Sequence, residues 1–228
     1  MKKFIMVLFI LILSTSLLLG CGSENVDEKP VLSESTTDFE FIDNQLNLKK
    51  DEIYEIRWSS DNKFVAYVLG DSLSMYGQLY IWEVGGEEPE MVGNVEDRIC
   101  ELILSPNNEY LLVDIGTSVQ RFGVVVSNIE KKKIGEINYI GNAFWTNDSN
   151  YLIVGVVSDI KPSIEIELEG TVDIASYNIK TGEINFIEKG TAEYNFYPVE
   201  VREDGTVVYK KSYFDNQIDE ETFEYKIN

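Results

Sequence analysis

The chain has no histidine and only two cysteines among its 228 residues, and both scarcities exclude kinds of chemistry. Without histidine, no Ser-His-Asp or Cys-His catalytic arrangement can form, and zinc sites that use histidine are excluded. Basic residues are also few, because 19 Lys and Arg stand against 40 Asp and Glu, which gives a formal net charge of −21. So negative a chain is expected to be repelled by nucleic acid and by anionic lipid head groups.

Other catalytic and metal-binding patterns are missing as well. The sequence has no G-x-S-x-G motif, and Gly85-Gly86 is not followed by the helix that a phosphate-binding loop requires. No pair among the acids is distinguished as the two carboxylates of a glycosidase, and nothing supports Ser-Lys catalysis. Calcium would suit so acidic a chain, but no D-x-[DN]-x-[DN]-G loop is present. We therefore predict no catalytic residue, no metal site and no cofactor, and do not expect an enzyme.

The first residues have the layout of a secretory signal. Lys2 and Lys3 precede the apolar run Phe4–Leu13, and the run ends close to Cys21. Residues Leu18-Leu19-Gly20-Cys21 resemble the lipobox of bacterial lipoproteins, although Leu19 stands where a small residue is commoner.

This resemblance implies cleavage after Gly20 and attachment of acyl chains such as palmitate at Cys21. The alternative is an uncleaved anchor, but Phe4–Leu19 is 16 residues long, and a spanning helix needs about 20. If Cys21 carries lipid, Cys100 has no partner for a disulfide. Its apolar surroundings, RICELILS, then predict a small buried hydrophobic side chain.

Three segments follow from composition. Residues 1–20 are the predicted signal peptide, and residues 21–37 are the lipidated cysteine and an acidic, Ser- and Thr-containing tether. Residues 38–228 are expected to fold as a single domain, long enough to bury a substantial core.

A strand–turn–strand pattern occurs four times in this domain. The copies IRWSSDNKFVAYV, LILSPNNEYLLVD, AFWTNDSNYLIVG and VEVREDGTVVYK align on Asp61, Asn107, Asp148 and Asp204. The turn residues are 107−61 = 46, 148−107 = 41 and 204−148 = 56 residues apart, and periods of this length in an all-β chain predict propeller blades. A large apolar residue before three of the turns (Trp58, Leu104 and Trp145) suits packing between neighbouring blades.

The period-two pattern predicts four strands in each of the first three repeats and three in the last, with no convincing helix after the signal. The predicted strands are Tyr54–Ser59, Phe64–Leu69, Gln78–Val84, Met91–Val95, Cys100–Ser105, Tyr110–Ile115, Phe122–Ile129, Lys133–Ile137, Asn142–Thr146, Tyr151–Val157, Val172–Ile179, Glu183–Glu188, Tyr197–Arg202, Thr206–Phe214 and Thr222–Ile227.

These repeats resemble the TolB-like, WD40-like propeller repeats, which also form the non-catalytic propellers of prolyl-oligopeptidase-type proteins. The best copy is Trp58-Ser59-Ser60-Asp61, followed by Ala66-Tyr67 and Tyr80-Ile81-Trp82. The Gly-His and Trp-Asp signature of true WD40 repeats is absent. The resemblance implies an all-β, small or incomplete β-propeller of about four blades of antiparallel strands. A two-sheet β-sandwich is the alternative.

The last repeat lacks an outermost strand. The alternating sequence DFEFID, Asp38–Asp43, is a candidate to supply it and to close the ring. The third repeat carries an insertion in which Ile164, Ile166 and Leu168 alternate with three glutamates. We predict a projecting hairpin with one acidic face that is either merely solvated or a docking surface for a basic partner. Its glutamates are Glu165, Glu167 and Glu169.

These features together predict a lipid-anchored, extracytoplasmic protein. The acidic, Lys- and Ile-rich composition favours the outer face of a Gram-positive cell membrane. We expect the propeller-like domain to act as an accessory scaffold for an envelope or membrane protein. A module that binds a glycan, peptide or small molecule is the alternative, because propellers present loops on a rigid platform.

Overall fold

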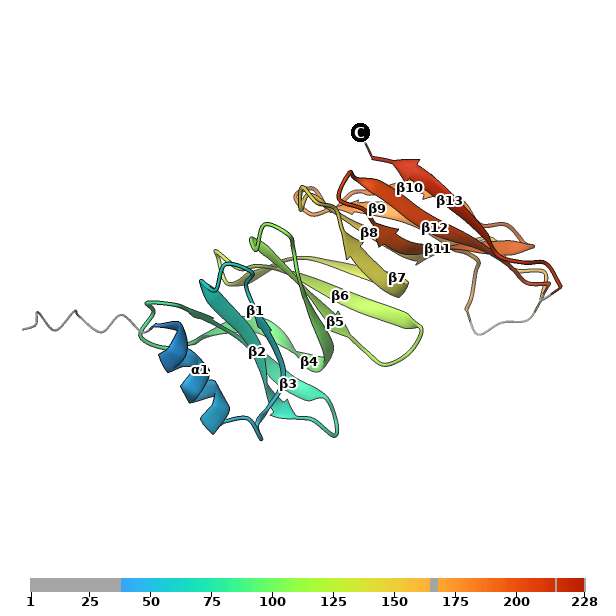
Figure 1. Cartoon of the computed structure of the whole chain (residues 1–228). Helices are drawn as coiled ribbons and strands as arrows, with labels where there is room; N and C mark the ends of the chain where they lie inside the picture. The colour runs from blue at the N-terminus through green and yellow to red at the C-terminus, as the bar shows by residue number, and fades with distance from the viewer. Residues whose placement is uncertain (1–37, 165–167, 216, 228) are drawn as a thin grey trace, which may run out of the picture. The chain divides into compact units, whose positions relative to one another are not determined.

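The computed structural model describes residues 38–164, 168–215 and 217–227, which belong to one compact unit. One helix, α1 (Phe39–Leu48), precedes the strands (Figure 1). The strands are β1 (Ile53–Trp58), β2 (Phe64–Asp71), β3 (Tyr76–Glu83), β4 (Glu90–Leu104), β5 (Tyr110–Ile115), β6 (Gln120–Ser127), β7 (Lys132–Trp145), β8 (Tyr151–Val157), β9 (Val172–Asn178), β10 (Ile184–Glu188), β11 (Tyr194–Val201), β12 (Thr206–Tyr213) and β13 (Glu221–Lys226).

Antiparallel pairing divides the strands into four modules. The long strand β4 pairs with β3 as far as Arg98 and with β5 from Ile99 onward, so it ends module 1 and begins module 2. In the same way β7 pairs with β6 and then, beyond a register shift after Ile140, with β8 of module 3. Module 3 ends with β10, and β11–β13 form the three-stranded module 4. The predicted all-β architecture of four-stranded repeats is confirmed, and a sandwich of two sheets is not formed.

The repeated turn has the same structure in every module. The carboxylate or amide oxygen of the turn residue accepts the backbone N–H two residues later, as from Lys63 to Asp61 at 3.3 Å and from Thr206 to Asp204 at 3.0 Å. The residue that follows the turn acid or amide has a positive φ, a conformation in which Asn and Gly occur far more readily than bulky residues. These residues are Asn62, Asn108, Ser149 and Gly205.

The turns also join neighbouring modules. The Asn108 amide donates to Ser60 Oγ at 2.9 Å, the Asn107 backbone N–H donates to Ser149 Oγ at 3.1 Å, and the Asn147 amide donates to the Arg202 carbonyl at 2.8 Å. Polar side chains at the turns therefore have a structural role, since they connect all four modules at one end.

Trp145 packs between modules 2 and 3, as its position before the turn predicts. Its ring is 7% exposed, stacks on Tyr110 with centroids 6.2 Å apart, and donates from Nε1 to the Ile103 carbonyl at 3.0 Å. Trp58 occupies the equivalent place in module 1, which is the first module of the described residues. It contacts Phe39 of α1 instead, with ring centroids 4.4 Å apart.

The prediction that Asp38–Asp43 forms a closing strand is wrong, because this segment begins α1. Asp38 caps the helix by accepting the Phe41 N–H at 2.8 Å, and Ile42 and Leu46, one helical turn apart, are both buried. They pack on a cluster that includes Val65, Tyr67 and Trp82, so α1 covers the open face of module 1.

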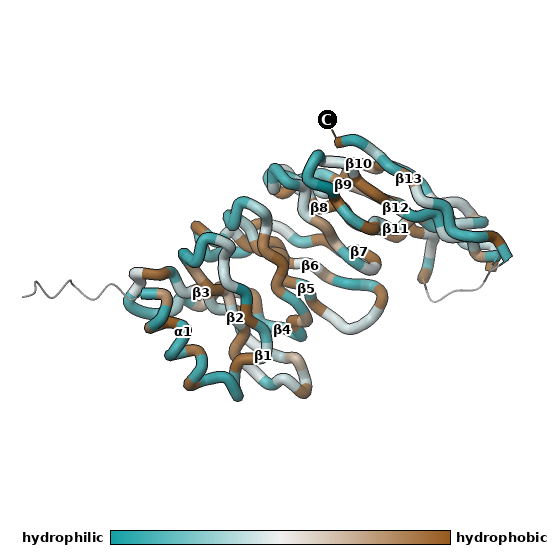
Figure 2. Tube along the Cα trace, viewed as in Figure 1, coloured by the Kyte–Doolittle hydropathy of each residue, from teal (hydrophilic) through white to brown (hydrophobic). Residues whose placement is uncertain are grey.

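Module 4 forms the other end of the array and packs on module 3. Its residues Val207 and Tyr209 pack on Ile153 and Ile174 of module 3. Strand alternation turns Val208, Lys210 and Glu224 to the opposite face. That face carries the ion pairs Arg202–Glu224 (2.8 Å) and Lys210–Glu220 (3.0 Å). Within the described residues, no strand of module 1 pairs with one of module 4. Apolar residues are concentrated on the paired strands (Figure 2).

Candidate binding surface

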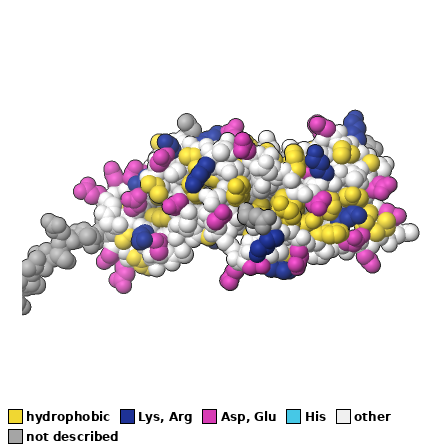
Figure 3. All heavy atoms as spheres, turned by 90° about the horizontal axis from the view of Figure 1, so that it is seen from above, with side chains coloured by type: hydrophobic (Ala, Val, Ile, Leu, Met, Phe, Trp, Pro, Cys, Tyr) yellow, Lys and Arg dark blue, Asp and Glu magenta, His cyan; other side chains and the backbone are white. Residues whose placement is uncertain are grey.

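The two ends of the modules differ in chemistry. One, the turn end, carries the four repeated turns. On the face seen in Figure 3, acidic and basic side chains are interspersed with hydrophobic ones. We call the opposite end the loop end. It carries one connection within each module. These are the loops β2–β3 (72–75), β5–β6 (116–119), β8–β9 (158–171) and β12–β13 (214–220). Residues 165–167 and 216 of these loops are not described.

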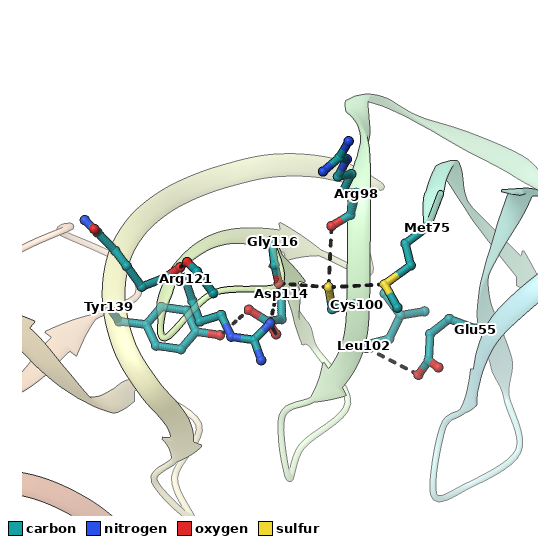
Figure 4. Close-up of polar contacts among 11 residues, drawn as sticks. Glu55, Met75, Arg98, Cys100, Leu102, Asp114, Gly116, Arg121 and Tyr139 are labelled. Atoms are coloured by element: carbon teal, nitrogen blue, oxygen red, sulfur yellow. Dashed lines mark hydrogen bonds and ion pairs between the residues drawn. The ribbon is translucent and has the colours of Figure 1, made fainter. Parts of the chain in front are cut away.

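A buried polar cluster lies beneath the loop end of module 2 (Figure 4). Asp114, at the end of β5, is 5% exposed and accepts a hydrogen bond from the Tyr139 hydroxyl at 2.7 Å. Arg121, at the start of β6, lies 3.3 Å from the other carboxylate oxygen and donates to the Gly116 carbonyl. Burial raises the pKa of Asp114, whereas Tyr139 and Arg121 act in the opposite direction. Asp114 accepts from Tyr139 and is paired with Arg121, so the polar groups of the cluster have partners within it. Its main role is therefore to hold the β5–β6 loop in place.

Cys100 connects this loop to module 1. Its Sγ lies 2.9 Å from the Gly116 carbonyl and 3.8 Å from Met75 Sδ (Figure 4). Met75 has a φ of 57°, and its carbonyl accepts the Tyr54 hydroxyl. The free thiol is half-buried at the loop end, so the prediction of a buried hydrophobic side chain is wrong. The reason is that Cys100 lies directly after the residue at which β4 passes from module 1 to module 2, where the pairing with β5 has an irregular register.

Modules 1 and 2 are also joined at their inner strands. Arg57 of β1 donates from Nε to the Leu102 carbonyl of β4 at 3.0 Å and lies 3.4 Å from Glu55. Burial raises the pKa of Glu55, while Arg57 opposes this shift. Because Arg57 is about half exposed, this ion pair contributes little to stability, and we assign it to alignment of the strands.

Two hollows open at the loop end. The first, of about 350 Å³, lies between modules 2 and 3 and has a polar lining: Glu101, Ile103, Asp114, Arg121, Tyr139, Gly141, Asn142, Ala143 and Phe144. The second, also of about 350 Å³, brings together loops of modules 2, 3 and 4 and is mostly apolar or aromatic: Val119, Leu168, Asn195, Tyr197, Ser212, Tyr213 and Phe214.

Exposed apolar side chains occur on every described loop of this end. Leu73, in the β2–β3 loop, is 95% exposed. The others are partly exposed: Met75, Val119, Ile160, Ile164 and Ile218, together with Tyr76 at the start of β3. The repeated turns of the opposite end consist of Ser, Asp, Asn, Lys, Arg, Glu, Pro, Thr and Gly. The repeated turns expose no large apolar side chain, although Ile129 in the neighbouring β6–β7 connection is exposed, whereas every described loop of the loop end exposes at least one.

The residues singled out in the sequence are placed as follows. Cys21, Glu165 and Glu167 lie outside the described residues, and Glu169 is exposed in the β8–β9 loop. The described parts of the insertion, 158–164 and 168–171, contain no strand, so the predicted hairpin is not seen there. A Cβ on Gly170 would lie 1.8 Å from the Ser158 carbonyl, so this glycine permits a close approach of two segments rather than a hairpin turn.

The described part of the chain contains no group of three or more Cys, Asp and Glu side chains that could hold a metal ion. Sequence reasoning missed the Asp114 cluster. A single charged residue inside the apolar strand YLLVDI was the available signal, because a buried carboxylate needs partners.

Comparison with known proteins identifies the fold. No family model and no curated protein matches the chain. Among solved structures, the chain is similar to the β-propeller domain of the Trilobed protease from Pyrococcus furiosus, which has an open velcro topology (TM-score 0.54, 13% identity, covering 77% of this chain and 54% of that one).

Two peptidase structures are also similar. A prolyl endopeptidase gives a TM-score of 0.53 at 13% identity, covering 80% of this chain and 30% of that one. Acylaminoacyl peptidase from Pyrococcus horikoshii gives 0.52 at 12% identity, covering 77% and 31%. The chain thus spans about half of the first structure and under a third of the others. These likenesses confirm the predicted β-propeller fold, and at such identities they show the fold alone.

Proposed function

We propose that the protein is a lipid-anchored, extracytoplasmic scaffold whose propeller-like domain binds a protein of the membrane or envelope at its loop end. The observation that carries the proposal is the contrast between the two ends. The turns bond neighbouring modules to one another, whereas all four loops expose apolar side chains.

Anchoring is proposed from the lipobox-like Leu18–Cys21 and the polar segment that follows it. Two or more acyl chains at Cys21 would hold the domain at the membrane firmly, whereas one chain binds only marginally. Within the described residues, no helix has the length and apolar character to cross a membrane.

A non-catalytic role is supported by the side chains at the loop end. The chain has no histidine, and Asp114, Tyr139 and Arg121 are engaged with one another. The similar solved structures include peptidases, but the resemblance is to their propeller parts, so no peptidase activity is proposed here.

Chemical crosslinking in intact cells, followed by affinity purification of the full-length protein and mass spectrometry, tests the proposal. We expect one membrane or envelope protein at near-equal amounts, and expect Cys21→Ser to release the protein from the membrane fraction. Recovery of the protein alone would count against a scaffold, and membrane retention of Cys21→Ser would count against a lipid anchor.

A second candidate function is the binding of a glycan, peptide or small molecule. It is favoured by the polar hollow of about 350 Å³ that Glu101, Arg121 and Asn142 help to line. Retention on cell-wall polysaccharide, lost in Asn142→Ala, would support this function over the scaffold. We rank it second because Asp114 already engages the Arg121 guanidinium.

A further inference from the structure

We infer that the loop end is the docking surface for a protein segment that carries both basic and apolar side chains. This inference rests on the proposed scaffold function and adds where the partner binds and what chemistry it has. We define the loop-end surface as the exposed apolar residues of the loops and the acids beside them: Leu73, Met75, Tyr76, Val119, Ile160, Ile164 and Ile218, with Asp71, Asp159, Glu169, Asp215 and Asp219.

The loops that carry these apolar residues are connected to one another. Cys100 contacts both Met75 of the first loop and Gly116 of the second. Val119 of the second loop then lines one hollow together with Leu168 and Phe214 of the third and fourth. Single exposed apolar residues are ordinary on a protein surface, but a connected set at one end marks an interaction site.

The charge of the surface selects the partner. The described loops carry five acids, Asp159, Glu169, Asp215, Asp219 and Glu220, and one cation, Lys161. Glu220 is paired with Lys210 at 3.0 Å, and Asp71 ends β2 beside the first loop. Asp71 and Asp215 are directed toward their own loops, where they accept the N–H groups of Leu73 at 3.0 Å and Gln217 at 2.9 Å. Asp159, Glu169 and Asp219 are exposed in the same loops as Ile160, Ile164 and Ile218. Complementary charge steers association and excludes wrong partners, so a basic segment fits this surface.

Other occupants fit less well. A second copy of the chain would bring two net charges of −21 together. A lipid surface with anionic head groups would be repelled by the negative charge of the chain and of the loops that carry Ile160 and Ile218. Both remain outcomes that the experiment below distinguishes.

The test places a photo-crosslinking amino acid at one position at a time in the full-length, lipidated protein in intact cells. Leu73, Val119 and Ile218 probe the loop-end surface. Ile129 is the matched control, because it is an apolar side chain, 70% exposed, in the β6–β7 connection at the turn end. We expect one protein to be captured from the three loop positions, with yield from Ile129 lower by roughly tenfold or more. The crosslinked peptide should have a net positive charge and contain apolar residues.

A second set of variants tests the charge. Asp159→Asn, Asp215→Asn and Asp219→Asn together should lower the crosslinking yield from Leu73 by roughly three- to tenfold. The matched control removes three exposed acids of the turn end (Glu87→Gln, Glu88→Gln and Glu203→Gln) and should leave that yield unchanged. Thermal unfolding of both variants checks that each is folded.

The outcomes separate the inference from the proposed function. Capture of a protein from Ile129 but not from the loop positions would overturn the inference and leave the scaffold function standing. Capture of lipid, of a second copy, or of an acidic segment at the loop positions would also overturn the inference. No protein captured from any position would overturn both.

Discussion

The carboxylates of the repeated turns stabilise the fold through bonds that favour their ionised form. In Asp204, hydrogen bonds from the Thr206 hydroxyl and N–H, together with Lys226, lower the pKa from 3.8 to about 2. Asp61 is shifted in the same direction, also to about 2, by Lys63 and Ser59. These bonds therefore stabilise the fold at pH values above the ordinary pKa of the carboxylates, and the stabilisation is lost in acid.

The sign of this contribution gives the first prediction. Because the folded pKa of Asp204 lies below the unfolded value, its contribution is present above 3.8 and is lost as pH falls through about 2. Asp204→Asn keeps a side-chain oxygen and removes the charge, so the variant should be less stable than the wild type above about pH 4, with the difference shrinking toward about pH 2. Urea unfolding across this range measures it. A difference of the same size at both ends of the range would contradict the assignment.

The indole of Trp145 provides a second test at the residue scale. Trp145→Phe keeps an aromatic ring but leaves the Ile103 carbonyl without its donor, which should cost about 1 kcal/mol of unfolding free energy. Trp145→Ala should cost about 3–5 kcal/mol, because a cavity forms between modules 2 and 3. Both values come from denaturant unfolding. A loss below about 1 kcal/mol in Trp145→Ala would show that this side chain does not hold the two modules together.

At the scale of the element, α1 acts as a cap for module 1. Ile42→Ala should lower the unfolding free energy by about 2–4 kcal/mol, since Ile42 is fully buried against module 1. Leu48→Ala, at an exposed position of the same helix, is the matched control and should change stability by less than about 0.5 kcal/mol. Equal effects of the two substitutions would mean that α1 does not pack on module 1.

The strands could be predicted from sequence because their signals are local. Period-two alternation and the Asp or Asn turn are contained within about a dozen residues, and the predicted strand Tyr110–Ile115, for example, has the same bounds as β5. The helix could not be predicted, because Phe39 and Phe41 alternate like a strand and only Ile42 and Leu46 carry helical spacing. The helix is favoured by its packing on module 1, where Phe39 contacts Trp58 and Phe41 contacts Trp82. These contacts join residues far apart in the sequence, so the local pattern does not contain them.

The candidate surface was harder to predict than the fold. Loops have no period, and the exposure of Leu73 or Val119 depends on which strands pair on either side of them. The acidic insertion is visible in the sequence, but the pattern of residues does not show that three further loops lie at the same end. Chemistry assembled from separate loops is visible only once the strand order is known.

At the scale of the whole molecule, the modules form an open array with two different caps. Repeat arrays need terminal units with covered or polar outer faces, because an unpaired apolar face would aggregate. Here α1 covers the first face, and ion pairs such as Arg202–Glu224 make the last face polar. Among the described residues, module 4 has three strands and none of them pairs with module 1, so the array is open.

Residue-resolved hydrogen exchange of the purified domain tests this open array most directly. Because β13 pairs with β12 alone, we predict that every second amide of Glu221–Lys226 exchanges rapidly while the amides of α1 after its first turn are protected like those of β2. Uniform protection along β13 together with rapid exchange in Phe39–Leu48 would show that a further strand completes module 4, and would contradict the open, helix-capped array.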